Sequence, residues 1–284
     1  MILDGRATAD QLLAELKEDI ASSAARPPGL AFLLVGDHPA SKTYVEAKKK
    51  KCQEVGIQSL VHKYEASISE KELLRHIQTL NDDPLIDGIL VQLPLPAHID
   101  KDIILMSIDP LKDVDGFHPI NMGKLAIGNE DGFIPCTPLG IVELLKRNSI
   151  SCEGKRAVIL GRSTIVGKPL ALLLMQNKEW LNATVTVAHS KTPDLEKVCK
   201  SADILIAAIG MPKFISAKMV QEGAIVVDVG INRLKDGTIV GDVDFQAVSP
   251  HCSFITPVPG GVGPMTIAML LQNTWLSYVR SSQS

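Results

Sequence analysis

The sequence predicts an α/β protein of two domains, each built on a parallel sheet that helices cover on both faces. Short apolar segments of strand length alternate with longer segments of helical periodicity, the pattern that forms parallel sheets. This alternation runs from about residue 9 to residue 93 and starts again near residue 137. A chain of 284 residues is long enough for two domains of ordinary size. We therefore expect one domain over residues 1–137 and a second over residues 138–264.

The first half contains alternating helices and strands. Leu12, Leu16 and Ile20 recur at helical spacing, and Ser69 followed by Glu72 is a capping box that starts a helix. The apolar strand segments end at glycine or proline, which indicates turns. The expected helices cover residues 9–23, 41–55 and 69–80, and the expected strands cover residues 30–35, 60–64 and 86–93.

The second half repeats the alternation. Thr137 and Pro138 suit the cap and first turn of a helix that runs to about residue 148. Expected strands follow at residues 156–160, 184–188, 204–209 and 224–229, with helices that begin near residues 168, 194 and 216. A glycine-rich turn, residues 259–264, precedes a final helix from residue 265 to about residue 278.

Composition indicates a soluble cytoplasmic protein. A net charge of −3 offers no basic excess for nucleic acid. Five scattered cysteines without a Cys-x-x-Cys pair suggest reduced thiols and no zinc site. The first residues lack the pattern of a signal peptide, and no apolar segment approaches the ~18 residues of a membrane span. We therefore expect neither a nucleic-acid nor a membrane partner.

A glycine-bearing loop, residues 161–167, follows the strand at 156–160 and precedes an apolar helix. Gly161 suits a tight turn, and the helix N-terminus then offers N–H groups to a pyrophosphate. Ser163 and Val166 stand where the usual dinucleotide fingerprint has glycine. The spacing alone leaves nucleotide binding and a plain strand–helix turn about equally open.

The end of the next strand bears on which nucleotide would bind. An NAD site usually has a carboxylate there for the ribose hydroxyls, but residues 189–192 contain none. Arg162, Ser190 and Lys191 would suit the additional phosphate of NADP. The alternative is that Ser190 only caps a turn before Pro193.

Polar residues in the first half can form a proton-transfer site. Tyr44 and Lys48 lie four residues apart, so on a helix they share one face. Gln92 and Asp115 could supply an amide and a carboxylate from other loops to hold a polar heterocycle. Taken singly, each has a structural explanation: a half-buried aromatic, a surface cation, an amide that holds a proline-rich loop, and a turn.

Together these residues make the chain resemble the methylenetetrahydrofolate dehydrogenase/methenyltetrahydrofolate cyclohydrolase family from end to end. Ordered matches over most of the length are far more specific than any one of them. The matching segments are Ser41-x-x-Tyr44-x-x-x-Lys48, Val91-Gln92-Leu93-Pro94-Leu95-Pro96, Asp113-Val114-Asp115-Gly116, Pro135-Cys136-Thr137-Pro138, Gly161-Arg162-Ser163-x-x-Val166-Gly167-x-Pro169, His189-Ser190-x-Thr192, Asp228-Val229-Gly230-Ile231-Asn232, and Pro259-Gly260-Gly261-Val262-Gly263-Pro264-Met265-Thr266.

The resemblance implies a role for each of the four candidate residues of the first half. Lys48 would be the catalytic lysine, Tyr44 would stack beside the folate and orient it, and Gln92 would hydrogen-bond near Lys48. Asp115 would accept hydrogen bonds from the pterin. Hydride transfer from the methylene group to NADP requires alignment, whereas water addition to the methenyl cation requires proton transfers that a lysine can perform.

The resemblance also implies the cofactor site and the architecture. It implies a Rossmann-type NADP-binding domain, a cleft between the domains, a C-terminal helix, 265–284, that completes the first domain, and a homodimer formed through the nucleotide domain. The cofactor site would comprise Gly161, Arg162, Ser163, Ser190 and Ile231, and the turn that closes over the ligands would contribute Gly261, Pro264 and Thr266 to substrate binding.

Three alternatives remain at this point. A dehydrogenase of the same family without cyclohydrolase activity is disfavoured by the presence of Lys48 and Gln92. A shikimate-type NADP-dependent reductase would need different substrate residues. A non-catalytic NADP-binding module would be favoured by a lost lysine or an altered 161–167 loop, and the sequence has neither.

Overall fold

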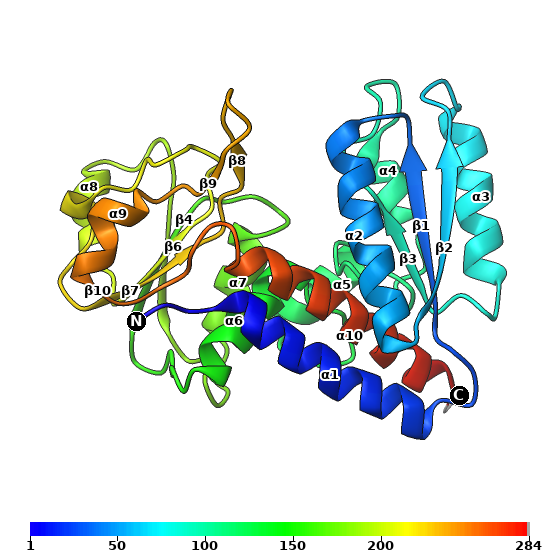
Figure 1. Cartoon of the computed structure of the whole chain (residues 1–284), viewed down its shortest axis with the longest axis horizontal. Helices are drawn as coiled ribbons and strands as arrows, with labels where there is room; N and C mark the ends of the chain where they lie inside the picture. The colour runs from blue at the N-terminus through cyan, green and yellow to red at the C-terminus, as the bar shows by residue number, and fades with distance from the viewer. Residues whose placement is uncertain (283–284) are drawn as a thin grey trace. The chain divides into compact units, whose positions relative to one another are not determined.

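The computed structural model of the chain (Figure 1) describes residues 1–282, apart from the side chain of Ala40. The chain forms two compact units. The first unit comprises Gln11–Cys136 and Ile267–Ser284, and the second comprises Met1–Asp10 and Thr137–Thr266. Their boundaries fall inside three helices: α1 (Gly5–Ser23), α6 (Cys136–Arg147) and α10 (Val262–Ser282).

The first unit contains a parallel sheet with the strand order β2-β1-β3. Every residue of the central strand is buried, as its uninterrupted apolar sequence requires. Helices α3 and α4 pack on the face that carries Ala31, Leu33 and Val35, and α2 contacts β1 and β2. The elements are β1 (Gly29–Val35), α2 (Pro39–Val55), β2 (Gln58–Tyr64), α3 (Glu70–Asp82), β3 (Gly88–Val91), α4 (Lys101–Met106) and α5 (Pro119–Ala126).

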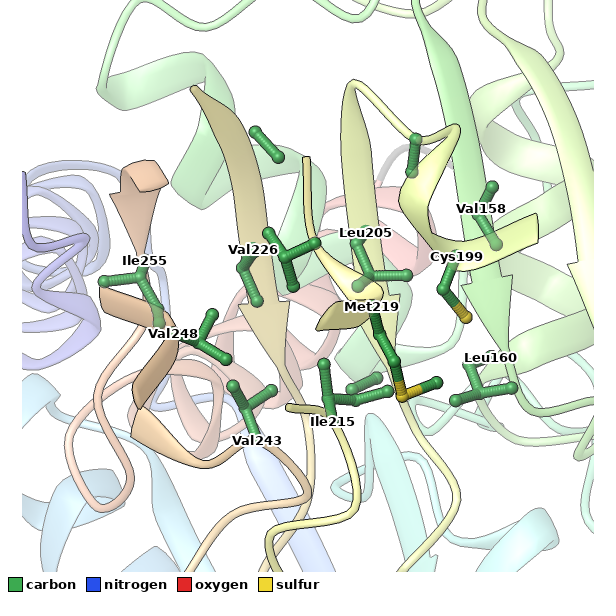
Figure 2. Packing of buried hydrophobic residues seen from close by; sticks show 14 of the residues in the cluster. Val158, Leu160, Cys199, Leu205, Ile215, Met219, Val226, Val243, Val248 and Ile255 are labelled. Carbon is green, nitrogen blue, oxygen red and sulfur yellow. The ribbon is translucent and has the colours of Figure 1, made fainter. Parts of the chain in front are cut away.

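The second unit contains a five-stranded parallel sheet with the order β10-β7-β6-β4-β5. Figure 2 shows part of its core, in which side chains from β4, β6, β7 and β10 meet those of Ile215, Met219 and Val243. The elements are α6, β4 (Arg156–Leu160), α7 (Gly167–Leu174), β5 (Thr184–Ala188), α8 (Leu195–Lys200), β6 (Ile204–Ala207), η1 (Ala217–Met219), β7 (Ala224–Asp228), β8 (Asn232–Arg233), β9 (Ile239–Val240), α9 (Phe245–Val248), η2 (Ser249–His251), β10 (Cys252–Ile255) and α10.

The N-terminus differs from the expected domain division. Residues 1–10 cluster with the second unit, whereas the sequence placed them in the first domain. The cause is backbone pairing with β10: the Leu3 N–H donates to the Ile255 carbonyl at 2.8 Å, and Ile2 forms a parallel bridge with Ile255. The pairing joins residues more than 250 positions apart, so no local pattern reveals it.

Two expected elements of the second half are wrong in extent. The helix expected near residue 216 is the single 3₁₀ turn η1. The strand expected over 204–209 ends at Ala207, because the N–H groups of Ile209 and Gly210 donate to the side chain of Asp242. In residues 1–282, no helix combines the length and the apolar character needed to cross a membrane.

Candidate active site

Helix α2 presents Tyr44 and Lys48 one turn apart. Pro39 occupies the first turn, and Gly56 ends the helix in the left-handed conformation with φ of 91°. Tyr44 is 45% exposed and Lys48 is half-buried, so both lie beside the buried face of the helix. That buried face consists of Ser41, Val45, Cys52 and Val55.

Gln92 meets Lys48 from the loop after β3. The Lys48 Nζ donates to Gln92 Oε1 at 3.2 Å, although the residues are 44 positions apart. The Gln92 amide is oriented at its other end, because Nε2 donates to the Leu93 carbonyl at 2.8 Å. The Gln92 N–H also donates to the Leu33 carbonyl at 2.9 Å, which continues the β1–β3 pairing. The sheet therefore places the amide oxygen where the ammonium group can reach it.

Asp115 lies in the electrostatic field of Lys48. Burial raises the pKa of the Asp115 carboxyl, while the positive charge of Lys48 and the nearby Cys136 thiol act in the opposite direction. The same carboxyl contributes to raising the pKa of the Cys136 thiol well above its usual value, after the larger effect of burial. An amine, an amide and a carboxylate thus gather in the first unit, with Tyr44 one helical turn from Lys48.

The turn that carries Asp115 is held by its neighbours and not by Asp115 itself. The Gly116 N–H donates to the Asp113 carbonyl at 3.0 Å, which closes the turn. Gly116 has φ of 75°, and a Cβ there would approach the Ile134–Pro135 backbone to 2.7 Å. Within residues 1–282, the Asp115 carboxylate receives no backbone hydrogen bond. The carboxylate is therefore available to a ligand.

Asp113 anchors this turn from inside the protein. Its carboxylate is 1% exposed and accepts from the His118 N–H at 2.8 Å, the Asn121 Nδ2 at 2.9 Å and the Phe117 N–H at 3.3 Å. Asn273 of α10 holds the next residue, because its Nδ2 donates to the Val114 carbonyl at 2.8 Å. Sequence reasoning assigned no role to Asp113 or Asn273. The available signal was the pair of adjacent amides, Gln272 and Asn273, in the largely apolar sequence of the final helix.

In the second unit, the 161–167 loop is tightly built. Gly161 has φ of 124°, and a Cβ at this position would collide with the Ala208 backbone. The Gly161 N–H donates to the Ala188 carbonyl at 2.9 Å, which joins the loop to the end of β5. The Ser163 Oγ accepts from the N–H groups of Val166 at 3.1 Å and Gly167 at 3.4 Å. Serine at a usual glycine position therefore satisfies the N–H groups of the last loop residue and of the first residue of α7.

The same loop offers free donors to an anion. In the part of the chain that the structure describes, the backbone N–H groups of residues 162–165 have no protein acceptor. These residues are exposed and precede the N-terminus of α7, a helix of eight residues. Successive free N–H groups at a helix N-terminus fit phosphate groups. The side chains of Arg162 and Ser190 are also exposed, Ser190 two residues after β5.

Ile231 lies beside the start of α10 in the second unit. Ile231 is 51% exposed, and its Cδ1 lies 3.7 Å from the position of a Cβ on Gly263. Gly261, directly before α10, is buried, and Pro264 in its first turn is half-buried. The Thr266 Oγ1 of α10 lies 3.1 Å from the Thr137 Oγ1 of α6, so the first turns of these two helices are joined.

The predicted site residues thus fall into two groups. Tyr44, Lys48, Gln92 and Asp115 belong to the first unit. The second unit carries Gly161, Arg162, Ser163, Ser190, Ile231, Gly261, Pro264 and Thr266. The first group has the elements of a proton-transfer site, and the second has the elements of a nucleotide site.

Two family models match the chain. Residues 3–115 match the catalytic domain of tetrahydrofolate dehydrogenase/cyclohydrolase, and residues 135–282 match the NAD(P)-binding domain of the same family. The two matches divide the chain near the start of α6, in agreement with the division of the site residues.

Similar proteins cover the whole chain. A protein of Protochlamydia amoebophila named bifunctional protein FolD is 58% identical, and the alignment covers 99% of this chain and 98% of that protein. The solved structure of a bifunctional methylenetetrahydrofolate dehydrogenase/cyclohydrolase from Campylobacter jejuni is 55% identical, with a TM-score of 0.95 and 99% of both chains covered. A Trypanosoma brucei enzyme solved with NADP and an inhibitor is 38% identical, with a TM-score of 0.94, and the match covers 100% of this chain and 99% of that one.

Proposed function

The chain belongs to the tetrahydrofolate dehydrogenase/cyclohydrolase family, and we propose that the two groups of residues described above carry its two reactions. The protein is a bifunctional enzyme of one-carbon folate metabolism. It oxidises 5,10-methylene-tetrahydrofolate to the 5,10-methenyl form with NADP and hydrolyses that product to 10-formyl-tetrahydrofolate. The predicted family, two-domain α/β fold, enzyme class and cofactor are thereby confirmed.

Folate binding is assigned to Asp115 and Tyr44. The Asp115 carboxylate has no backbone partner in residues 1–282 and can accept hydrogen bonds from the pterin N–H groups. Tyr44, 45% exposed and one turn from Lys48, can stack on the folate and orient it. Gly261, Pro264 and Thr266 are proposed to complete substrate binding.

The cofactor is assigned to the 161–167 loop and its neighbours. The free N–H groups of residues 162–165 suit the pyrophosphate, and Arg162 and Ser190 suit the additional phosphate of NADP. Gly161 and Ser163 shape this loop, and the exposed Ile231 offers a further contact. When bound, NADP accepts the hydride of the one-carbon unit. The chain's own contribution is to hold donor and acceptor in line.

The cyclohydrolase step is assigned to Lys48 and Gln92. Water adds to the methenyl carbon, loses a proton, and ring opening then requires a proton on a folate nitrogen. Lys48 Nζ can transfer these protons. Gln92 positions the Lys48 ammonium group, because its Oε1 accepts from Nζ and its own orientation is set by the hydrogen bond to the Leu93 carbonyl. The Lys48–Gln92 hydrogen bond in the field of Asp115 is the observation that carries this proposal.

The alternatives lose their support. A dehydrogenase without cyclohydrolase activity would have no need of the Lys48–Gln92 pair that the structure contains. A shikimate-type reductase is disfavoured because both halves of the chain match folate-enzyme models. A non-catalytic module would not retain a carboxylate, an amide and an amine gathered beside one another.

We also propose a cytoplasmic homodimer that forms through the second unit. Strand β5 is an edge strand of the five-stranded sheet, and its Thr184, Thr186 and Val187 are exposed. An exposed, uncharged edge of β-branched residues favours pairing with another strand. Val187→Lys should halve the mass measured by light scattering, whereas Gln246→Lys on α9 should not. A dimeric Val187→Lys protein would contradict this interface.

Two assays on purified protein test the proposed function. The first follows reduction of NADP, and in parallel NAD, with methylene-tetrahydrofolate. The second follows hydrolysis of methenyl-tetrahydrofolate without nucleotide. Lys48→Met should lower the hydrolysis rate by ~10²–10⁴-fold and leave NADP binding nearly intact. Lys50→Met, on an exposed part of the same helix, is the matched control. Hydrolysis by Lys48→Met at the wild-type rate would remove Lys48 from the mechanism.

A further inference from the structure

The second unit contains two buried carboxylates that belong to neither group of site residues. Asp228 ends β7 and is 3% exposed, and Asp242 follows β9 and is 0% exposed. Neither forms a salt bridge within residues 1–282. Burying a carboxylate without a cation is costly unless hydrogen bonds compensate for lost water. Such a pair requires an explanation beyond stability.

Hydrogen bonds satisfy both carboxylates. Asp228 accepts from the backbone N–H groups of Gly230, Asp242 and Val243, each at 2.9 Å. Asp242 accepts from the N–H groups of Ile209 at 2.7 Å and Gly210 at 2.9 Å, and from Asn232 Nδ2 at 2.8 Å. The two residues are linked directly, because the Asp242 N–H is one of the donors to Asp228.

Four of the six donors belong to two segments at the carboxyl ends of neighbouring strands, and the other two are the N–H groups of Asp242 and Val243, which follow β9. Residues 209–210 follow β6 and come directly after Ala208, whose backbone excludes any side chain at Gly161. Residues 229–232 follow β7 and include Ile231, whose side chain reaches Gly263. Ligands of parallel α/β sheets bind at this edge. The carboxylate pair therefore determines the positions of residues 209–210 and 229–232 at the edge of the sheet that carries the 161–167 loop.

Glycines opposite the carboxylates make the packing specific. A Cβ on Gly230 would collide with the Asp242 carboxylate, and a Cβ on Gly241 would collide with the Asp228 carboxylate. Each carboxylate thus occupies the space that a side chain at the facing glycine would need.

We propose that Asp228 and Asp242 are positioning residues of the NADP site, which hold loops 209–210 and 229–232 in the arrangement that binds the cofactor. The inference rests on the proposed function of the second unit. Neither residue needs to touch NADP. Their effect passes through the backbone of the two loops and through Asn232.

The Asp242–Asn232 hydrogen bond allows a reciprocal test. Asn232→Asp places a second carboxylate against Asp242, and the two repel. Adding Asp242→Asn exchanges the two groups and restores an amide-to-carboxylate hydrogen bond in the reverse direction. We expect Asn232→Asp to raise the NADP dissociation constant about tenfold or more by calorimetry, and the double variant to recover most of that loss. Asp242→Ala, which removes the acceptor altogether, should raise the NADP dissociation constant at least as much as Asn232→Asp does.

Three readouts separate positioning from general stability. The Michaelis constant for NADP should rise in Asn232→Asp, while nucleotide-free hydrolysis of methenyl-tetrahydrofolate stays within about twofold of wild type. Asp203→Asn is the control, because Asp203 accepts from Arg156 and Gln221 at the amino ends of the strands, away from the proposed cofactor site. It should lower the melting temperature without changing NADP affinity.

Wild-type NADP affinity in Asn232→Asp and Asp242→Ala would overturn the inference. So would equal losses of NADP affinity in Asp203→Asn, because the effect would then be one of stability alone. A wild-type protein that fails to bind NADP would instead contradict the proposed function, so the two failures are distinguishable.

Discussion

The buried carboxyl of Asp113, in the turn that carries Asp115, makes the stability of the first unit depend on pH. Burial raises the pKa of this carboxyl from 3.8 to about 7, although hydrogen bonds from Asn121 and His118 act in the opposite direction. Between about pH 4 and pH 7 the folded protein therefore holds a proton that the unfolded chain has released. For a carboxyl whose pKa is raised on folding, this means that stability falls as the pH rises through that window.

The size of the effect follows from the two pKa values. The interval from 3.8 to about 7 is about 3 pH units, which corresponds to roughly 4 kcal/mol. Asp113→Asn has no carboxyl to titrate. We expect the free energy of unfolding of the wild type, minus that of the variant, to fall by roughly 3 kcal/mol between about pH 4.5 and pH 8, the part of the interval that this range covers. The amide places a donor against donors, so we expect the variant to be less stable at every pH, and this constant offset leaves the slope unchanged.

Fluorescence allows the measurement to be confined to the first unit. The chain has two tryptophans, and Trp275 lies in the part of α10 that belongs to the first unit. In a Trp180→Phe background, urea unfolding followed by Trp275 emission reports on that unit. Asp102→Asn, an exposed carboxyl of the same unit, shows how much pH dependence any such replacement produces. A difference between wild type and Asp113→Asn that stays constant or grows with pH would refute the reasoning.

Two further predictions concern the ligands. Asp115→Asn should fold normally and bind NADP, because Asp115 makes no backbone hydrogen bond in the described chain, yet lose folate affinity by about 5- to 150-fold as a donor replaces an acceptor. Near-normal folate affinity in calorimetry would return Asp115 to a purely structural role in the turn. Arg162→Ala should raise the Michaelis constant for NADP about tenfold or more and that for NAD far less, because only NADP has the additional phosphate. Equal rises for both nucleotides would show that Arg162 does not bind that phosphate.

The elements that local patterns define were predictable. Helix α3 begins after Ser69, whose side chain accepts from the Glu72 N–H as the capping box predicts. The loop at Gly161 follows a buried strand and precedes α7, as its glycines indicate. Sequence periodicity could not reveal β10, which pairs with β7 and with the N-terminal residues, because its four residues lack a distinctive pattern.

The candidate site likewise has features that the sequence determined and features that only the tertiary structure decided. The sequence by itself determined the family, the residue types of both groups and the sharing of one helical face by Tyr44 and Lys48, because spacing and local conformation decide these features. Only the tertiary structure placed Lys48 Nζ 3.2 Å from Gln92 Oε1 and brought Asn273 to the backbone beside Asp115. It alone joined Asp228 to Asp242 through loops of separate strands. Such contacts depend on which strands are neighbours in a sheet, and strand order is set by packing of the whole chain.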